Sequence, residues 1–310
     1  MIISCGEALI DFFKSDETGQ FMPLIGGSLL NVSVAVAKSG AKSALMTNLS
    51  TDQFGDAFAK YLAENGVSDE FITRSEHLTG LMFVAYNADK SASYSYYGHQ
   101  TAEQNYIYDA KNLALGTEVN CLHFGSFSLV IGQTSISYPA LIANEYKNHI
   151  ISIDLNIRDA IEPDMSLWDA QFEKLLPMTH IAKASADDVL LMHDLDEINQ
   201  DICFEYMQKW QASGAKLSVI TDAEKGAYIL WQGERLHLKG KSANIIDTVG
   251  AGDCFIANFL SGLESAGYLN IDKFDRLDMA TIEQAASRAI DAATYTIAQK
   301  GAKFPSPTDI

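Results

Sequence analysis

Short apolar runs alternate with amphipathic stretches along most of this 310-residue chain, and this alternation restricts the folds that it can adopt. Residues 44–49, 121–124 and 149–155 are almost continuously apolar, which is typical of strands buried on both faces of a parallel sheet. Helical spacing of apolar residues follows two of these runs, over 52–65 and 137–147. Because parallel neighbours need a crossover connection, the pattern predicts a doubly wound α/β fold with a mainly parallel sheet.

The rest of the chain follows the same plan with one interruption. Residues 1–38 are expected to form a strand, a loop and a helix over 29–38. Residues 81–86 and 93–97 flank a polar turn, which predicts a β-hairpin inserted into the α/β chain. Further helices are expected over 168–176, 186–192, 198–212 and 282–298, and further strands over 180–184, 217–221, 227–231 and 236–238.

The charge balance excludes some partners. The chain has 40 Asp and Glu residues against 22 Lys and Arg, a formal net charge of −18, so its field repels nucleic acid and anionic membranes. The sequence has no basic leader followed by an apolar run and no membrane-length apolar stretch, so we expect a cytoplasmic protein. Four scattered cysteines without a CxxC pair favour reduced thiols over disulfides or zinc.

The stretch 247–263 has the strongest local signal for a binding site. Its apolar residues repeat with helical spacing, so a helix is expected from about 252 to 266. Free amides in the first turn of a helix form an anion site, and glycines at 250 and 252 let a ligand approach the backbone. Asp253 is then either an N-cap or a carboxylate that takes the proton of a hydroxyl during phosphoryl transfer.

Other nucleotide motifs fit less well. Gly240-Lys241-Ser242 resembles the end of a P-loop, but Arg235 occupies the position of the first glycine. Phe255 stands where a dinucleotide fingerprint has its third glycine, which disfavours a nicotinamide oxidoreductase. The helix start near residue 252 is therefore the best candidate for a phosphate site.

Two separated motifs together resemble the signatures of the ribokinase-like carbohydrate kinases. The first is Gly26-Gly27 with Asn31, and the second is the segment 247–253. The resemblance spans nearly the whole chain and includes residues 154–158 and 183–185.

This resemblance implies one kinase domain over residues 1–310, with a doubly wound α/β body and a small β lid. The lid is expected from segments of about 12–24 and 79–105. The implied reaction moves the γ-phosphoryl group of ATP to a sugar hydroxyl with the help of Mg²⁺. The lid would exclude water from ATP, and its tyrosines 94, 96 and 97 would stack on the sugar.

The resemblance also assigns residues to the reacting groups. Asp253 is expected to be the general base, and the catalytic helix start also includes Gly250, Ala251 and Gly252. The amides of Ala251, Gly252 and Asp253 are expected to form the anion hole for the transferred phosphoryl group. The positions that match sugar contacts are Asp11, Gly27, Asn31 and Arg158. For three of them a structural role is the alternative: Asp11 in a turn, Asn31 as a helix cap and Arg158 in a surface ion pair.

The nucleotide and metal positions are carried over in the same way. Lys183, Thr221, Lys225 and Gly226 match positions near the ATP phosphates, although Lys183 could be structural and Lys225 could face solvent. Residue 223 is alanine where the family usually has glycine. Asp188 matches the magnesium-linked acidic position and is expected to act through water, and a K⁺ ion beside Asp247 is a further expectation.

Residues 6–11 and 123–129 and the pair at 167–168 are similar to those of bacterial fructokinases, which implies D-fructose as the acceptor and fructose 6-phosphate as the product. Other acceptors considered are 2-keto-3-deoxygluconate, ribose and nucleosides, because residues 28–30 and the tyrosine-rich hairpin depart from the usual pattern. A non-catalytic sugar or nucleotide sensor is the alternative of a different class. An apolar lid would also suit a homodimer contact.

Overall fold

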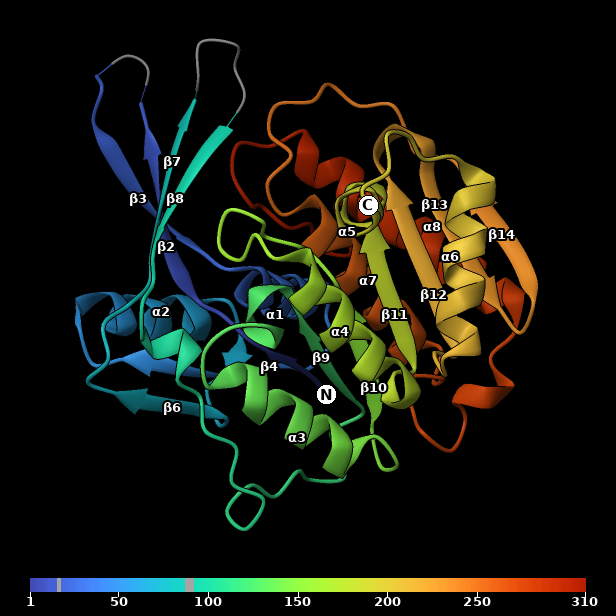
Figure 1. Ribbon diagram of the computed structural model, residues 1–310, viewed down its shortest axis with the longest axis horizontal. Coiled ribbons are helices and arrows are strands. Elements are labelled where there is room, and N and C mark those ends of the chain that lie inside the picture. Colours follow the sequence, from blue (N-terminus) through green and yellow to red (C-terminus); the bar gives the residue numbers. More distant parts are fainter. Residues whose placement is uncertain (16–17, 87–91) are drawn as a thin grey trace.

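The computed structural model describes residues 1–15, 18–86 and 92–310, with the side chains of residues 86 and 92–94 left out (Figure 1). Its main sheet has the strand order β14-β13-β12-β11-β10-β9-β1-β4-β5, with β6 also paired to β4. Pairing is parallel except at β12–β13 and β13–β14, which confirms the mainly parallel sheet. The strands are β1 (Ile2–Cys5), β4 (Ser43–Ser50), β5 (Val67–Ser68), β6 (Ile72–Ser75), β9 (Cys121–Gly125), β10 (Ile150–Asp154), β11 (Ile181–Ser185), β12 (Leu217–Asp222), β13 (Gly226–Trp231) and β14 (Glu234–Leu238).

Helices cover both faces of this sheet (Figure 1). Neighbouring residues of β1 show the two layers: Ile2 packs in a cluster with α1, α7 and α8, whereas Ile3 packs with α3, α4, α5 and α6. Both residues are fully buried, which explains the continuous apolar character of such strands. The helices are α1 (Ser28–Lys38), α2 (Gln53–Glu64), α3 (Thr134–Glu145), α4 (Met165–Leu175), α5 (Ala186–His193), α6 (Gln200–Ala212), α7 (Ala251–Ser265) and α8 (Met279–Ile297).

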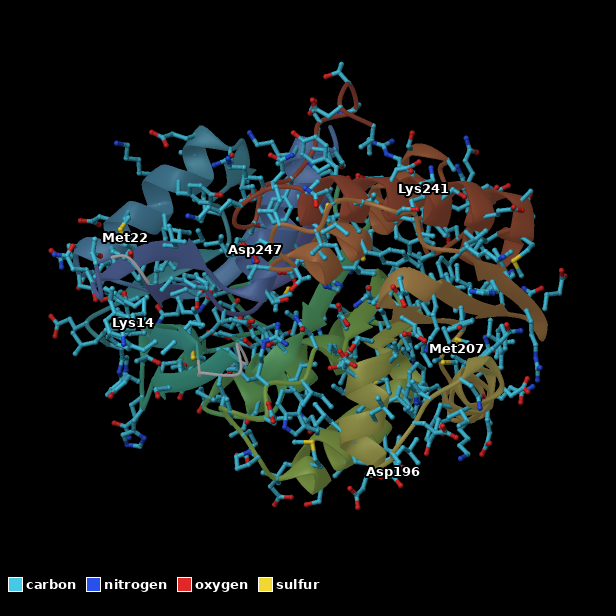
Figure 2. All side chains as sticks on the ribbon, turned by 90° about the horizontal axis from the view of Figure 1, so that it is seen from above. Lys14, Met22, Asp196, Met207, Lys241 and Asp247 are labelled. Carbon is cyan, nitrogen blue, oxygen red and sulfur yellow. The ribbon has the colours of Figure 1, made fainter. Side chains whose placement is uncertain are left out.

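A second, smaller sheet stands beside this body with the order β3-β2-β7-β8. Figure 2 shows Lys14 and Met22, from this sheet, at one end of the molecule, Met207 of α6 toward the other, and Asp247 between them. The strands are β2 (Leu9–Lys14), β3 (Phe21–Gly26), β7 (Leu81–Tyr86) and β8 (Ala92–Tyr97). The hairpin expected over 79–97 is confirmed as β7 and β8, and most of its polar turn lies outside the described residues.

The expectation from local patterns of a loop between the first strand and α1 is wrong, although the family resemblance implied that about 12–24 belong to a small β lid. Residues 9–14 and 21–26 form β2 and β3, and β2 pairs in parallel with β7, about seventy residues further along the chain. This pairing decides their structure, and local periodicity could not reveal it. Most other elements lie within a few residues of their expected bounds, as α7 does. Among the described residues no helix is long and apolar enough to cross a membrane.

Candidate active site

The carboxyl ends of the parallel strands and the first turns of α1 and α7 meet at one edge of the sheet. Glu7 follows β1, Asp154 ends β10, Lys183 lies in β11, and Ser28 and Asp253 lie in the two first turns. Ligands of doubly wound sheets bind at this edge. The side chains from these elements therefore form the candidate site.

The start of α7 combines a glycine N-cap with a nearby lysine side chain. Gly250 is its N-cap with φ 79°, a left-handed conformation that glycine adopts without strain. A Cβ on Gly252 would lie 3.8 Å from Nζ of Lys183, so the first-turn amides and a lysine side chain share one space. Ala251 and Gly252 also line the large cavity described below. Amides and a cation placed in this way suit a phosphate group.

Asp253 lies in the first turn of α7 and is buried. Its Oδ1 accepts a hydrogen bond from Oγ of Ser28 at 2.7 Å, and its Oδ2 accepts one from Nδ2 of Asn31 at 2.9 Å. Burial raises the pKa of Asp253, while the two hydrogen bonds and the positive charges of nearby side chains lower it. Since Gly250 occupies the cap position, the structure does not support the N-cap alternative for Asp253.

The glycine pair brings α1 close to the segment after β1. Gly27 is the N-cap of α1 with φ 109°, and a Cβ on it would lie 2.6 Å from the carbonyl oxygen of Glu7. The backbone N–H of Ser28 donates to Oε1 of Glu7 at 3.2 Å. Asn31 lies inside α1 with its amide on Asp253, so it is not a helix cap.

Three buried or largely buried carboxyl groups interact electrostatically with Arg158, whose side chain is exposed. Burial raises the pKa of Glu7 to about 7, and it raises the pKa of Asp11 to about 7 as well. The Arg158 guanidinium lowers the pKa values of both groups and of Asp253, while the charge of Asp253 raises those of Glu7 and Asp11. Asp11 lies within β2 rather than in a turn, and a Cβ on Gly26 would overlap its carboxylate.

Glu7 and Asp154 were not among the expected site residues. Oε2 of Glu7 accepts from Oγ of Ser128 at 2.6 Å. Oδ2 of Asp154 accepts from Nζ of Lys183 at 2.7 Å, and both of these side chains are buried. A signal was present in the sequence, because each carboxyl group interrupts or ends an apolar run that belongs in the core. The ion pair gives Lys183 a structural contact beside the start of α7.

A cavity of about 620 Å³ opens between the start of α7 and the strands β11 to β13. One part is polar and contains Asn156, Lys183 and Gly252, and another is apolar and contains Ile245, Ala293 and Ile297. This division suits a nucleotide, whose phosphates need polar groups and whose base needs an apolar cleft. The expected residues that line the cavity are Lys183, Asp188, Thr221, Gly226, Ala251 and Gly252.

Lys225 and Ala223 lie in the loop after β12. The lining of the cavity, within the described chain, omits Lys225, whose half-exposed ammonium pairs with Asp222 at 3.0 Å. Ala223 lines the cavity with φ 38°, a left-handed conformation that explains why glycine suits this position better.

The carboxylate of Asp188 is already held by the protein. Its Oδ1 accepts from the N–H of Ile157 at 2.7 Å, and its Oδ2 accepts from the N–H and Oγ of Ser185, both at 2.7 Å. Ser185 and Asp188 form a capping box at the start of α5. Asp188 therefore has a structural role that its spacing from Ser185 could have predicted.

Metal binding by protein side chains alone is not supported in the described part of the chain, where no group of three His, Cys, Asp or Glu residues converges. Oδ1 of Asp154 is buried and lacks a partner among the described residues, and Asp188 faces the cavity. Mg²⁺ often binds through one or two carboxylates, water and substrate phosphates, so these residues fit it. Asp247 accepts from the N–H groups of Val249 and Gly301, and K⁺ beside it stays a prediction.

The hairpin tyrosines face different ways. The hydroxyl of Tyr96 donates to Glu103 at 2.7 Å, and its ring packs on Phe127. Tyr97 lies on the face of the sheet opposite to that of Tyr96, where it packs against Phe83 and is 64% exposed. It therefore does not fit the expected stacking on a sugar. The side chain of Tyr94 lies outside the described residues.

A buried carboxylate beside a helix start and a nucleotide-sized cavity defines a site for phosphoryl transfer to an alcohol. Comparison with known families agrees, because residues 1–309 match the model of the pfkB family of carbohydrate kinases. The chain belongs to this family, which confirms the resemblance seen in its motifs. It is therefore an ATP-dependent sugar kinase.

Three individual proteins to which this chain is similar are fructokinases. The chain is 30% identical to a fructokinase of Rhizobium leguminosarum bv. trifolii over 284 residues, which is 90% of this chain and 84% of the relative. Its structure is similar to that of fructokinase from Xylella fastidiosa with bound ATP (TM-score 0.82, 25% identity, 97% and 93% of the two chains). Fructokinase from Vibrio cholerae, solved with fructose, ADP and calcium, shares the fold (TM-score 0.85, 22% identity, 99% and 96%).

Proposed function

We propose that this chain transfers the γ-phosphoryl group of ATP to the 6-hydroxyl of D-fructose. The observation that carries the proposal is the place of Asp253, a buried carboxylate within the first turn of α7 and beside the residues that match sugar contacts. The similarity to fructokinases supports fructose as the acceptor.

In this proposal each side chain has a defined task. Asp253 takes the proton of the attacking hydroxyl, while the amides of residues 251–253 and the ammonium of Lys183 stabilise charge on the transferred group. Thr221 and Gly226 contact the nucleotide, and Lys225 reaches it only if it leaves Asp222. Mg²⁺, where bound, would neutralise phosphate charge near Asp188 and Asp154.

The charges near the acceptor site favour a neutral sugar. Glu7, Asp11 and Asp253 all interact with the single guanidinium of Arg158. A sugar acid such as 2-keto-3-deoxygluconate would bring a further carboxylate to this acidic cluster, at a cost in binding energy. Asp11, Gly27, Asn31 and Arg158 are therefore proposed to bind a neutral polyol such as fructose.

The small sheet is proposed to be the lid of a single kinase domain, with segments of about 12–24 and 79–105. Asp11 lies within this sheet, so its movement would bring a sugar ligand toward Asp253. Exposed apolar residues on the sheet, Phe21, Met22, Leu24 and Tyr97, support a homodimer contact through the lid. Use of ATP supports the cytoplasmic location expected from the sequence.

The test is release of ADP in the presence of a panel of acceptors: fructose, ribose, 2-keto-3-deoxygluconate and a nucleoside. We expect the largest kcat/KM with fructose, and a loss of about 10²–10⁴-fold in kcat for Asp253→Asn, since that is the usual contribution of a positioned base. Turnover that persists unchanged in this variant would refute the assigned base. Tight sugar binding without turnover would favour the sensor alternative.

A further inference from the structure

Ser28 joins the proposed base to the nucleotide cavity through side-chain hydrogen bonds. Its Oγ donates to Oδ1 of Asp253 at 2.7 Å and accepts from Nδ2 of Asn156 at 2.6 Å. Asn156 lines the large cavity. Ser28 directly follows the glycine pair Gly26-Gly27 and is the first residue of α1.

The chemistry of the three groups fixes the direction of these bonds. An amide nitrogen can only donate, and an ionised carboxylate can only accept. The Ser28 hydroxyl must therefore point its hydrogen at Asp253. A hydroxyl that accepts one hydrogen bond while it donates another is polarised, which strengthens the bond that it donates.

The backbone on both sides holds this arrangement in place. The N–H of Ser28 is bound by the buried carboxylate of Glu7, and Gly27 before it has φ 109°. Asn156 has φ 41°, a left-handed conformation that asparagine tolerates better than most residues. Backbone conformations of this kind concentrate at functional sites.

We propose that Ser28 is a positioning residue for phosphoryl transfer, which orients the carboxylate of Asp253 and stabilises its ionised form, with Asn156 fixing the direction of the Ser28 hydroxyl. The inference rests on the proposed function, because it takes Asp253 as the base. A carboxylate has about four acceptor sites, so the bonds from Ser28 and Asn31 leave room for the sugar hydroxyl.

The phosphoryl transfer requires no proton transfer through Ser28. The sugar hydroxyl gives its proton to Asp253, its oxygen bonds to the γ-phosphorus of ATP, and the bond from that phosphorus to ADP breaks. Ser28 keeps its own proton throughout. Its effect is on the orientation and the basicity of the carboxylate.

Other ionisable groups also act on Asp253, and a substitution of Ser28 leaves all of them in place. Among the described residues, the groups with a recorded electrostatic effect on or from Asp253 are Glu7, Asp11, Asp154, Arg158, Lys183 and Cys254. A change in the pKa of Asp253 in a Ser28 variant therefore reports on the lost hydrogen bond. The hydrogen bond from Ser28 lowers the pKa of Asp253, so its removal should raise it.

The experiment compares the pH dependence of kcat for the wild type, Ser28→Ala, Ser28→Thr and the control Ser33→Ala. Ser33 is buried on the same helix, and its hydroxyl donates to the carbonyl of Leu30. We expect the acid limb of Ser28→Ala to move up by about one pH unit, the size of one hydrogen bond to a charged group. In Ser28→Thr the acid limb of the pH profile should return to its wild-type position, and in Ser33→Ala it should stay there.

Asn156→Gly tests the second bond, because glycine accepts the left-handed backbone and removes only the amide. We expect a smaller upward shift of the acid limb than in Ser28→Ala, and no further shift when the two substitutions are combined. An additional shift in the double variant would refute the role of Asn156 in orienting Ser28.

A carbon-13 NMR titration of the Asp253 carboxyl group gives a readout that does not depend on turnover. A higher pKa in folded Ser28→Ala than in the wild type supports the proposal, and an unchanged pKa overturns it. Turnover retained by Asp253→Asn would instead refute the base itself, so the two failures are distinguishable. Thermal melting of each variant shows whether it is folded.

Discussion

Replacement of Glu7 by glutamine should raise the free energy of unfolding at neutral pH, because it removes a charge that is buried in the folded protein. Glu7 is 1% exposed, and burial raises its pKa from 4.5 to about 7. Glutamine can keep both contacts, because its carbonyl accepts from the N–H of Ser28 and its amide can donate to the Ser128 hydroxyl. The variant therefore removes the charge with little change in packing.

The expected magnitude follows from the pKa shift. A carboxyl group with a raised native pKa binds more protons when folded, so its contribution to stability is complete below the unfolded pKa and is lost as pH rises through the native one. For Glu7 this window runs from 4.5 to about 7. At 1.36 kcal/mol per pKa unit the loss is about 3 kcal/mol, which the glutamine variant would not suffer.

The assay is urea unfolding of the wild type and Glu7→Gln at a series of pH values, followed by tryptophan fluorescence. Between pH 4.5 and pH 8, the free energy of unfolding of the variant should rise by about 3 kcal/mol relative to that of the wild type. Glu64→Gln is the matched control, because Glu64 is exposed and pairs only loosely with Lys60. A stability difference that is independent of pH, or one that moves against the variant, would refute the reasoning.

Two further substitutions test the nucleotide side of the site. Ala223→Gly should raise the free energy of unfolding by up to about 1 kcal/mol, because glycine adopts the φ of 38° without strain; a loss of stability in denaturant titration would contradict this. Lys183→Met should lower kcat by about 10²-fold while the protein stays folded, because Asp154, with a pKa already raised to about 6 by burial, can protonate once its partner is gone. Steady-state kinetics with circular dichroism measures both effects, and a kcat at the wild-type level would leave Lys183 a purely structural role.

Much of the body could be predicted from local sequence patterns. The continuous apolar runs became β9 and β10, and the helical spacing after the glycines of 250–252 became α7. These signals are local, because strand burial and helix amphipathicity both depend on the spacing of apolar residues that are close in the sequence. The capping box at Ser185 and Asp188 is also local, and the spacing of these two residues indicates it in addition to the metal-linked role that stays a prediction.

The acceptor side of the site depended on contacts between distant segments. β2 and β3 exist because β2 pairs with β7, and a run of alternating residues alone did not reveal this. Glu7 becomes a site residue because α1 approaches its carbonyl through Gly27. Such contacts depend on the packing of distant segments, and they leave no periodic pattern in the sequence of either segment.

The sequence by itself determined the α/β architecture, the glycine turn before α7 and the presence of an acidic residue in the first turn of that helix. Only the tertiary structure decided what surrounds that residue, because Ser28 and Asn31 reach Asp253 across more than two hundred residues of chain. The physical reason is that helix starts and buried strands follow from neighbouring side chains, whereas a hydrogen bond depends on atoms a few ångströms apart in space. The environment that sets the basicity of Asp253 is thus a product of the fold.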